Sequence, residues 1–123
     1  MSRESERFAV SARLRSFRYA FAGVLTLLRE QHNARLHLLA TGAVVALAWV
    51  LEVSRGDWLV LLLTMALVWL AEALNSALEY LCDAAVPDQH DLIRKAKDVA
   101  AAGVLICAGF AVVIAALVFL PYL

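Results

Sequence analysis

Residues 58–83 of the chain read WLVLLLTMALVWLAEALNSALEYLCD. The first part of this stretch, through Ala71, carries no charged side chain. The second part places acidic, amide and hydroxyl side chains among alanines, leucines, a tyrosine and a cysteine. Together the two parts exceed the roughly 20 residues that cross a hydrocarbon core. The stretch therefore predicts a transmembrane helix with polar side chains in one half.

The composition of the whole chain supports a membrane protein. Apolar residues make up 63% of its 123 residues, against roughly 45–50% in an ordinary soluble domain. A soluble chain of this size is mostly surface and could not bury so much hydrocarbon, and a disordered chain is excluded by the same figure. The net charge of zero argues against a general nucleic-acid binder. We predict an all-α membrane protein forming a single domain, 1–123.

Two further apolar runs lie at residues 36–51 and 99–123. We therefore expect transmembrane helices near 34–52, 58–83 and 95–120. Within residues 8–29, large apolar side chains recur every three or four positions, with arginines off that stripe. This pattern predicts an N-terminal amphipathic helix, 1–30, on the membrane surface. The alternative is a soluble cap packed on the helix bundle.

Basic residues predict the orientation in the membrane. Arginines are frequent before the first span, and Arg94, Lys95 and Lys97 lie between the second and third spans. Only Arg55 lies between the first and second. Because loops rich in lysine and arginine stay in the cytoplasm, we expect a multi-pass protein with a cytoplasmic N-terminus and a cytoplasmic 84–97 loop.

A polar edge runs along the second predicted span. At about 100° per residue, five polar side chains fall within about 100° of arc: Glu72, Asn75, Ser76, Glu79 and Asp83. A charge near the bilayer centre costs at least about 2.5–3.5 kcal/mol, so such groups usually pair with a cation, bind a metal or carry protons. One protonated, hydrogen-bonded glutamate would explain Glu72 alone but not five aligned groups. Three helices cannot enclose such an edge alone, so we expect an oligomer.

Two further clusters flank the predicted spans. The segment HDLIRKAKD, residues 90–98, places Arg94, Lys97 and Asp98 on one helical face. Cations near a helix start oppose the helix dipole, which favours a lipid headgroup or a phosphate as the compensating anion. Membrane anchoring alone would explain Arg94 but not Asp98. The segment REQHNARLH, residues 29–37, adds an acid, amides and imidazoles at the start of the first span.

These groups together suit phosphoryl transfer. Carboxylates and substrate phosphates are the ligands that Mg²⁺ prefers, and a lysine beside them can neutralise phosphate oxygens. The deeper carboxylate of Glu72 can take a proton from a lipid hydroxyl, and catalysis of phosphoryl transfer is mostly positioning and charge stabilisation. One alternative is a subunit of a proton or cation pathway that uses stacked membrane carboxylates. Another is a noncatalytic membrane assembly factor.

Three features carry a resemblance to a known family: EALNSALEYLCD at 72–83, the seven-residue step from Asp83 to His90, and AKDVAAAGVL at 96–105. With them the chain resembles the bacterial integral-membrane diacylglycerol kinase and undecaprenol kinase family, over roughly residues 13–121. The resemblance implies an inner-membrane homotrimer with shared active sites. It also implies transfer of the γ-phosphoryl group of MgATP to a lipid alcohol, giving undecaprenyl phosphate or phosphatidic acid. The segment NARLHLLA, 33–40, looks more like the undecaprenol kinase branch.

The resemblance also implies roles for individual residues. Glu72 would be the general base, Asn75 would orient it or the substrate, and we expect Ser76 to join Glu72 in binding the lipid. The residues expected to bind ATP are Tyr19, Glu79, Asp83, His90, Lys97 and Asp98. Glu79 would also bind the metal. The family often has a second metal-binding glutamate, whose position holds Gln31 here, so this role falls to Glu30 or Gln31.

Overall fold

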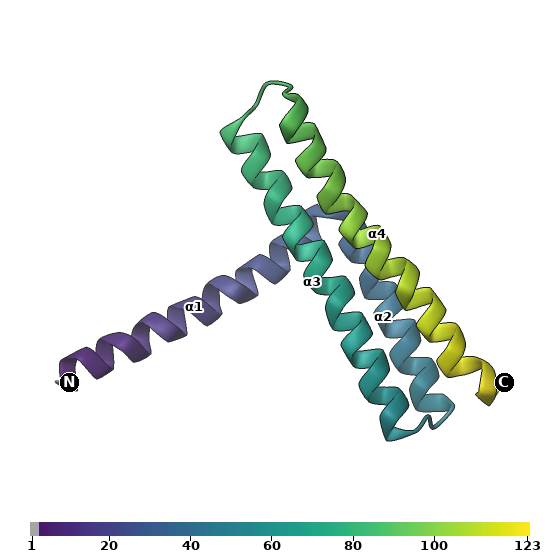
Figure 1. Ribbon diagram of the computed structural model, residues 1–123. Coiled ribbons are helices and arrows are strands. Elements are labelled where there is room, and N and C mark those ends of the chain that lie inside the picture. The colour runs from purple at the N-terminus through teal and green to yellow at the C-terminus, as the bar shows by residue number, and fades with distance from the viewer. Residues whose placement is uncertain (1–2) are drawn as a thin grey trace. The chain divides into compact units, whose positions relative to one another are not determined.

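The computed structural model describes residues 3–123, with side chains from Ala9 onward. The described chain is all-helical (Figure 1), as predicted. Its elements are α1 (Arg3–Glu30), α2 (His32–Val50), α3 (Arg55–Ala85), α4 (Asp91–Phe119) and a 3₁₀ turn, η1 (Leu120–Tyr122). The chain divides into two units, one through His32 and one from Asn33, and each is described by itself.

The first unit consists mainly of α1, one uninterrupted helix. The first two residues of the predicted helix, 1–2, lie outside the described residues. Phe17, Phe21 and Leu25 of the apolar stripe are exposed, and so are Arg15 and Arg18 beside it. An exposed apolar stripe with basic neighbours is typical of helices that lie on a membrane surface. The placement of α1 on that surface stays a prediction.

The second unit contains three helices that are long and apolar enough to cross a membrane, as predicted. α2 has 19 residues, close to the length of one crossing, whereas α3 has 31 and α4 has 29. A crossing needs about 20 residues, so α3 and α4 are longer than a perpendicular span requires. Tilt or an extension beyond the hydrocarbon accommodates such excess length.

Local hydrogen bonds move the helix ends away from the bounds that hydropathy predicts. α3 begins at Arg55 rather than near 58, because the Ser54 hydroxyl accepts a hydrogen bond from the Asp57 amide at 3.1 Å. α4 begins at Asp91 rather than near 95, because Nδ1 of His90 accepts from the Leu92 amide at 3.1 Å. α2 begins at His32 and ends at Val50, shortly before the positive φ of 52° at Glu52.

The buried apolar core lies at one end of the three-helix unit. The end of α2, the start of α3 and the end of α4 meet there (Figure 1). Its buried residues are Ala48, Val53, Leu61, Val118 and Phe119. Along the rest of the helices most large apolar side chains are exposed, which in a membrane protein leaves them for lipid or a partner helix.

A hydrogen-bonded clamp closes the same end of the unit. The Tyr122 hydroxyl donates to Oδ2 of Asp57 at 2.6 Å and accepts from the backbone amide of Ser54 at 3.1 Å. The chain's final turn is thereby joined to the first turn of α3. Because one partner is a carboxylate, the Tyr122–Asp57 bond is charge-assisted and stronger than a neutral hydrogen bond.

We expect Tyr122→Phe to lower the free energy of unfolding by about 1 kcal/mol, since it removes both hydrogen bonds and keeps the ring. The measurement is denaturant titration in mixed micelles of four proteins: the wild type, Tyr122→Phe, Asp57→Ala and the double variant. Together they form a double-mutant cycle. A coupling energy near zero between the two positions would show that the clamp does not stabilise the fold.

Candidate functional site

The polar edge of α3 changes from buried to exposed along its length. Glu72 is 1% exposed, Ser76 2% and Asn75 7%. Glu79 is half-buried, and the Asp83 side chain is 69% exposed. The deep half of the edge therefore faces the interior of the three-helix unit. One chain thus buries the first three polar groups of the edge but leaves Glu79 half-buried and Asp83 exposed, so the expectation that an oligomer completes the enclosure stays a prediction.

The buried half of the edge carries polar oxygens without hydrogen-bond partners. Within the described structure they are Oε2 of Glu72, Oδ1 of Asn75 and Oγ of Ser76. Buried polar atoms are nearly always hydrogen-bonded, and a group left unpaired in a native structure calls for an explanation. Three such atoms within two helical turns mark this segment as a candidate functional site.

Glu72 faces an imidazole from α2. Nε2 of His37 lies 3.4 Å from Oε2 of Glu72, close enough for an ion pair when the imidazole is protonated. The contact lacks the geometry of a hydrogen bond, because Oε2 has no hydrogen-bond partner among the described residues. The His37 side chain is 18% exposed, whereas that of Glu72 is 1% exposed. The contact from α2 to the carboxylate is thus made by the imidazole.

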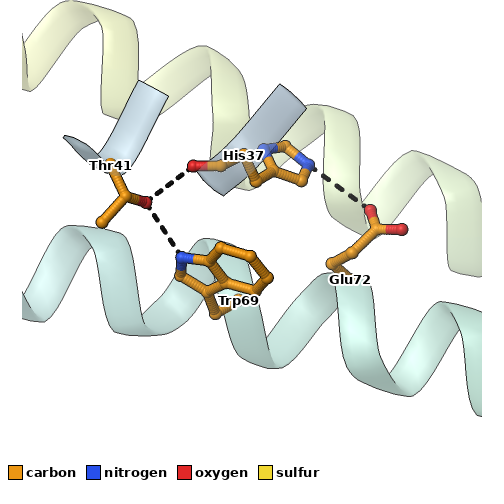
Figure 2. A network of polar contacts seen from close by, with 4 residues as sticks. All are labelled: His37, Thr41, Trp69 and Glu72. Atoms are coloured by element: carbon orange, nitrogen blue, oxygen red, sulfur yellow. Dashed lines mark hydrogen bonds and ion pairs between the residues drawn. The ribbon is translucent and has the colours of Figure 1, made fainter. Parts of the chain in front are cut away.

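A small polar network holds this part of α2 against α3 (Figure 2). The indole Nε1 of Trp69 donates to the Thr41 hydroxyl at 2.9 Å, and that hydroxyl donates to the backbone carbonyl of His37 at 2.7 Å. The His37 and Trp69 rings also meet edge to face, with centroids 6.2 Å apart. The network fixes the turn of α2 that presents His37 to Glu72.

Two hollows lie in the three-helix unit. A polar pocket of about 480 Å³ is lined by the α3–α4 loop and the helix ends beside it. Its lining includes Asp83, His90, Lys97 and Asp98. An apolar cavity of about 200 Å³ lies between α2, α3 and α4, and His37 forms part of its wall. The structure thus brings four of the six predicted ATP-binding residues to one pocket. Glu79 does not line that pocket but lies between it and Glu72 along α3.

Ion pairs organise the polar pocket. Nζ of Lys97, on α4, bonds Oδ1 of Asp83, at the end of α3, at 2.5 Å. On α4 itself, Nη1 of Arg94 lies 3.5 Å from Oδ2 of Asp98. Each pair has at least one largely exposed side chain, and Lys97 itself is partly exposed, so each pair adds little to stability. Both cations, Arg94 and Lys97, line the pocket.

The remaining predicted site residues belong to the first unit or its end. Tyr19 is 70% exposed on α1. Glu30 is the last residue of α1, and Gln31, whose backbone amide donates to the Leu27 carbonyl at 3.0 Å, separates α1 from α2. The roles of Tyr19 in binding ATP and of Glu30 or Gln31 in binding the metal stay predictions.

The donor set fits a magnesium ion that arrives with a nucleotide better than a resident metal. No group of three or more His, Cys, Asp or Glu side chains gathers as a metal cage in the part of the chain that the structure describes. Mg²⁺ does not need such a cage, since it is commonly held by one or two carboxylates together with substrate phosphates and water. The half-buried Glu79 carboxylate is a ligand of that kind.

Sequence reasoning missed the contribution of α2. The sequence pattern includes His37 only in the cluster at the start of the first span, and it gives Thr41 and Trp69 no role. Helical periodicity shows which residues of one helix share a face, but it does not show which residue of another helix lies opposite. The one available signal was the occurrence of threonine and tryptophan, both hydrogen-bond donors, within apolar runs.

Comparisons with known proteins identify the class. Residues 18–119 match the model of the family described as prokaryotic diacylglycerol kinase. The chain is 41% identical over 107 residues to a diacylglycerol kinase of Synechocystis, covering 86% of this chain and 61% of that protein. It is 30% identical over 123 residues, the full length of both chains, to an undecaprenol kinase of Bacillus subtilis. A diacylglycerol kinase of Pseudomonas aeruginosa is 32% identical over 84 residues, 68% of each chain.

These similarities define the protein as a membrane lipid kinase by class. More particularly, the chain belongs to the prokaryotic diacylglycerol kinase family. The resemblance stated from the sequence is thereby confirmed. The alternative of a proton or cation pathway finds no support in these comparisons.

Proposed function

We propose that the protein transfers the γ-phosphoryl group of MgATP to the hydroxyl of a lipid alcohol at the cytoplasmic face of the bacterial inner membrane. The observation that carries this proposal is the buried Glu72 carboxylate, whose polar edge leads along α3 to a pocket containing Lys97 and Asp98. A buried acceptor of protons at one end of the edge and a cation of α4 in the pocket at its other end suit a reaction between a lipid and a nucleotide.

The polar pocket is the proposed nucleotide site. Lys97 neutralises phosphate oxygens. When a phosphate replaces Asp83 as its partner, the ammonium group stays paired. Asp98, Asp83 and His90 contact the nucleotide, and Tyr19 of α1 completes the site. Positioned cations that offset phosphate charge supply much of the catalysis in phosphoryl transfer.

Glu79 would hold the magnesium ion of MgATP, together with Glu30 or Gln31. When bound, the ion neutralises charge on the phosphate oxygens. Glutamine coordinates through its carbonyl oxygen without adding charge, so a site that uses Gln31 would hold the ion with one carboxylate fewer than a site that uses Glu30.

Glu72 acts as the general base in this proposal. The lipid hydroxyl oxygen bonds to the γ-phosphorus, the bond from that phosphorus to the β–γ bridging oxygen breaks, and ADP leaves. The hydroxyl proton passes to the Glu72 carboxylate. Asn75 orients the carboxylate or the substrate, and the Ser76 hydroxyl contacts the lipid head; both carry buried oxygens with no hydrogen-bond partner among the described residues. A positioned base of this kind typically contributes about 10²–10⁴-fold in rate.

The lipid is undecaprenol or diacylglycerol, and we expect undecaprenol to be preferred. The support is the NARLHLLA segment and the match to the Bacillus undecaprenol kinase over the full length of both chains. We further propose a homotrimer with shared active sites, with a cytoplasmic N-terminus. The exposed apolar faces of the three spans leave room for contacts between protomers.

We expect Glu72→Gln to lower lipid phosphorylation by two or more orders of magnitude, because glutamine keeps the shape but accepts no proton. Assembly should be unchanged. The measurement is transfer of radiolabel from [γ-³²P]ATP by protein reconstituted with undecaprenol or diacylglycerol at equal surface density. Glu52→Gln, at the opposite end of the three-helix unit, is the matched control and should remain active.

Two outcomes of this assay would contradict the proposal. A wild-type protein that labels neither lipid at any Mg²⁺ concentration would overturn the function. Full activity of the Glu72→Gln variant would overturn the role of the carboxylate as base.

We expect Lys97→Met to lower kcat/KM for ATP by more than about tenfold, since it removes a cation from the phosphates. The exchange Asp83→Lys/Lys97→Asp, which keeps the ion pair but moves the cation to α3, should stay impaired. Lys95→Met serves as the control. If the exchange restored wild-type activity, Lys97 would serve only as the structural partner of Asp83.

A further inference from the structure

His37 is the titratable side chain that the structure places against the buried carboxylate. Its Nε2 lies 3.4 Å from Oε2 of Glu72, an oxygen that has no hydrogen-bond partner among the described residues. This distance is longer than a normal N–H···O hydrogen bond. Catalytic hydrogen bonds are often long before the substrate binds, and they tighten in the complex.

The surroundings of His37 restrict its movement. Its backbone carbonyl accepts from the Thr41 hydroxyl, which in turn accepts from the Trp69 indole, and the indole ring meets the imidazole edge to face (Figure 2). Trp69 lies on α3, three residues before Glu72. The network therefore joins α2 to the helix that carries the carboxylate. The edge-to-face contact with Trp69 therefore supports the imidazole itself, while the hydrogen bonds support the backbone of the turn that carries it.

We propose that His37 is a positioning residue for Glu72. Its Nε2–H donates to Oε2 and orients the carboxylate, leaving the other oxygen for the lipid hydroxyl. The Trp69–Thr41 link keeps the imidazole in place. His37 also forms part of the wall of the apolar cavity between α2, α3 and α4. This inference rests on the proposed function of Glu72 as general base.

The donor role can be separated from a merely structural one by two substitutions. Alanine removes the imidazole completely. Glutamine offers an amide N–H donor near the place of Nε2 but cannot take up a proton. Positioning by donation therefore predicts loss in His37→Ala and recovery in His37→Gln. His32→Ala, a histidine at the start of α2 that lies outside the proposed machinery, is the matched control.

We expect His37→Ala to lower kcat for lipid phosphorylation about tenfold to a hundredfold, the range that misplacement of a catalytic group produces. KM for ATP and for the lipid should change little. His37→Gln should recover most of the lost turnover, and Trp69→Phe, which removes the donor to Thr41, should show a smaller loss of kcat. The measurements are steady-state kinetics of reconstituted protein and denaturant unfolding in micelles.

A second readout does not depend on catalysis. Dicyclohexylcarbodiimide modifies protonated carboxyl groups in apolar surroundings, and mass spectrometry locates the modified residue. In the wild type and in His37→Gln the donor covers Oε2 of Glu72, so Glu72 should be modified faster in His37→Ala, where that oxygen is uncovered. If the wild type phosphorylated no lipid, the proposed function would fail, while this comparison would still test the contact.

Three results would overturn the positioning role. The first is wild-type kcat in His37→Ala, and the second is a folded His37→Gln variant as impaired as His37→Ala. The third is an equal rate of carbodiimide modification at Glu72 in all three proteins.

Discussion

A carboxylate buried inside a membrane-spanning helix bundle is the constraint on which the rest of the structure depends. Glu72 is 1% exposed, and ionised groups near a bilayer centre cost several kcal/mol unless they are compensated. The structure places the imidazole of His37 3.4 Å from this carboxylate, and it leaves further buried polar oxygens on the same edge of α3 without hydrogen-bond partners among the described residues. Such an arrangement does not improve the packing of an apolar bundle, so a functional demand explains it better.

α3 is long enough to run from this buried carboxylate to the polar pocket at the end of the helix. From Glu72 to Asp83 the helix rises about 16 Å at 1.5 Å per residue, and exposure increases along the way. The α3–α4 loop and the first turns of α4 then form the polar pocket around Lys97 and Asp98. Under the proposed function, a nucleotide in this pocket and a lipid hydroxyl near Glu72 approach the same edge from water and from the membrane.

The sequence predicted those features that depend on one helix at a time. Periodicity placed Glu72, Asn75 and Ser76 on one face, and the structure buries all three. Hydropathy predicted three spans, and the structure has three helices that are long and apolar enough to cross a membrane. The first residues of α3 and α4 are set by caps at Ser54 and His90, hydrogen bonds that a hydropathy average does not register.

Contacts between helices were out of reach of the sequence patterns. The approach of His37 to Glu72 and the bond from Tyr122 to Asp57 join residues far apart in the chain. Neither follows from spacing along one helix. The pocket is an intermediate case, since the resemblance named its residues but only the fold brings the end of α3 and the start of α4 together.

The most direct test of the central claim is a structure of the reconstituted protein with a nonhydrolysable ATP analogue, Mg²⁺ and a lipid alcohol. The account predicts the lipid hydroxyl oxygen within about 2.6–3.2 Å of a Glu72 carboxylate oxygen, with the nucleotide phosphates against Lys97. A lipid hydroxyl bound away from Glu72, with the carboxylate contacting neither substrate, would contradict it.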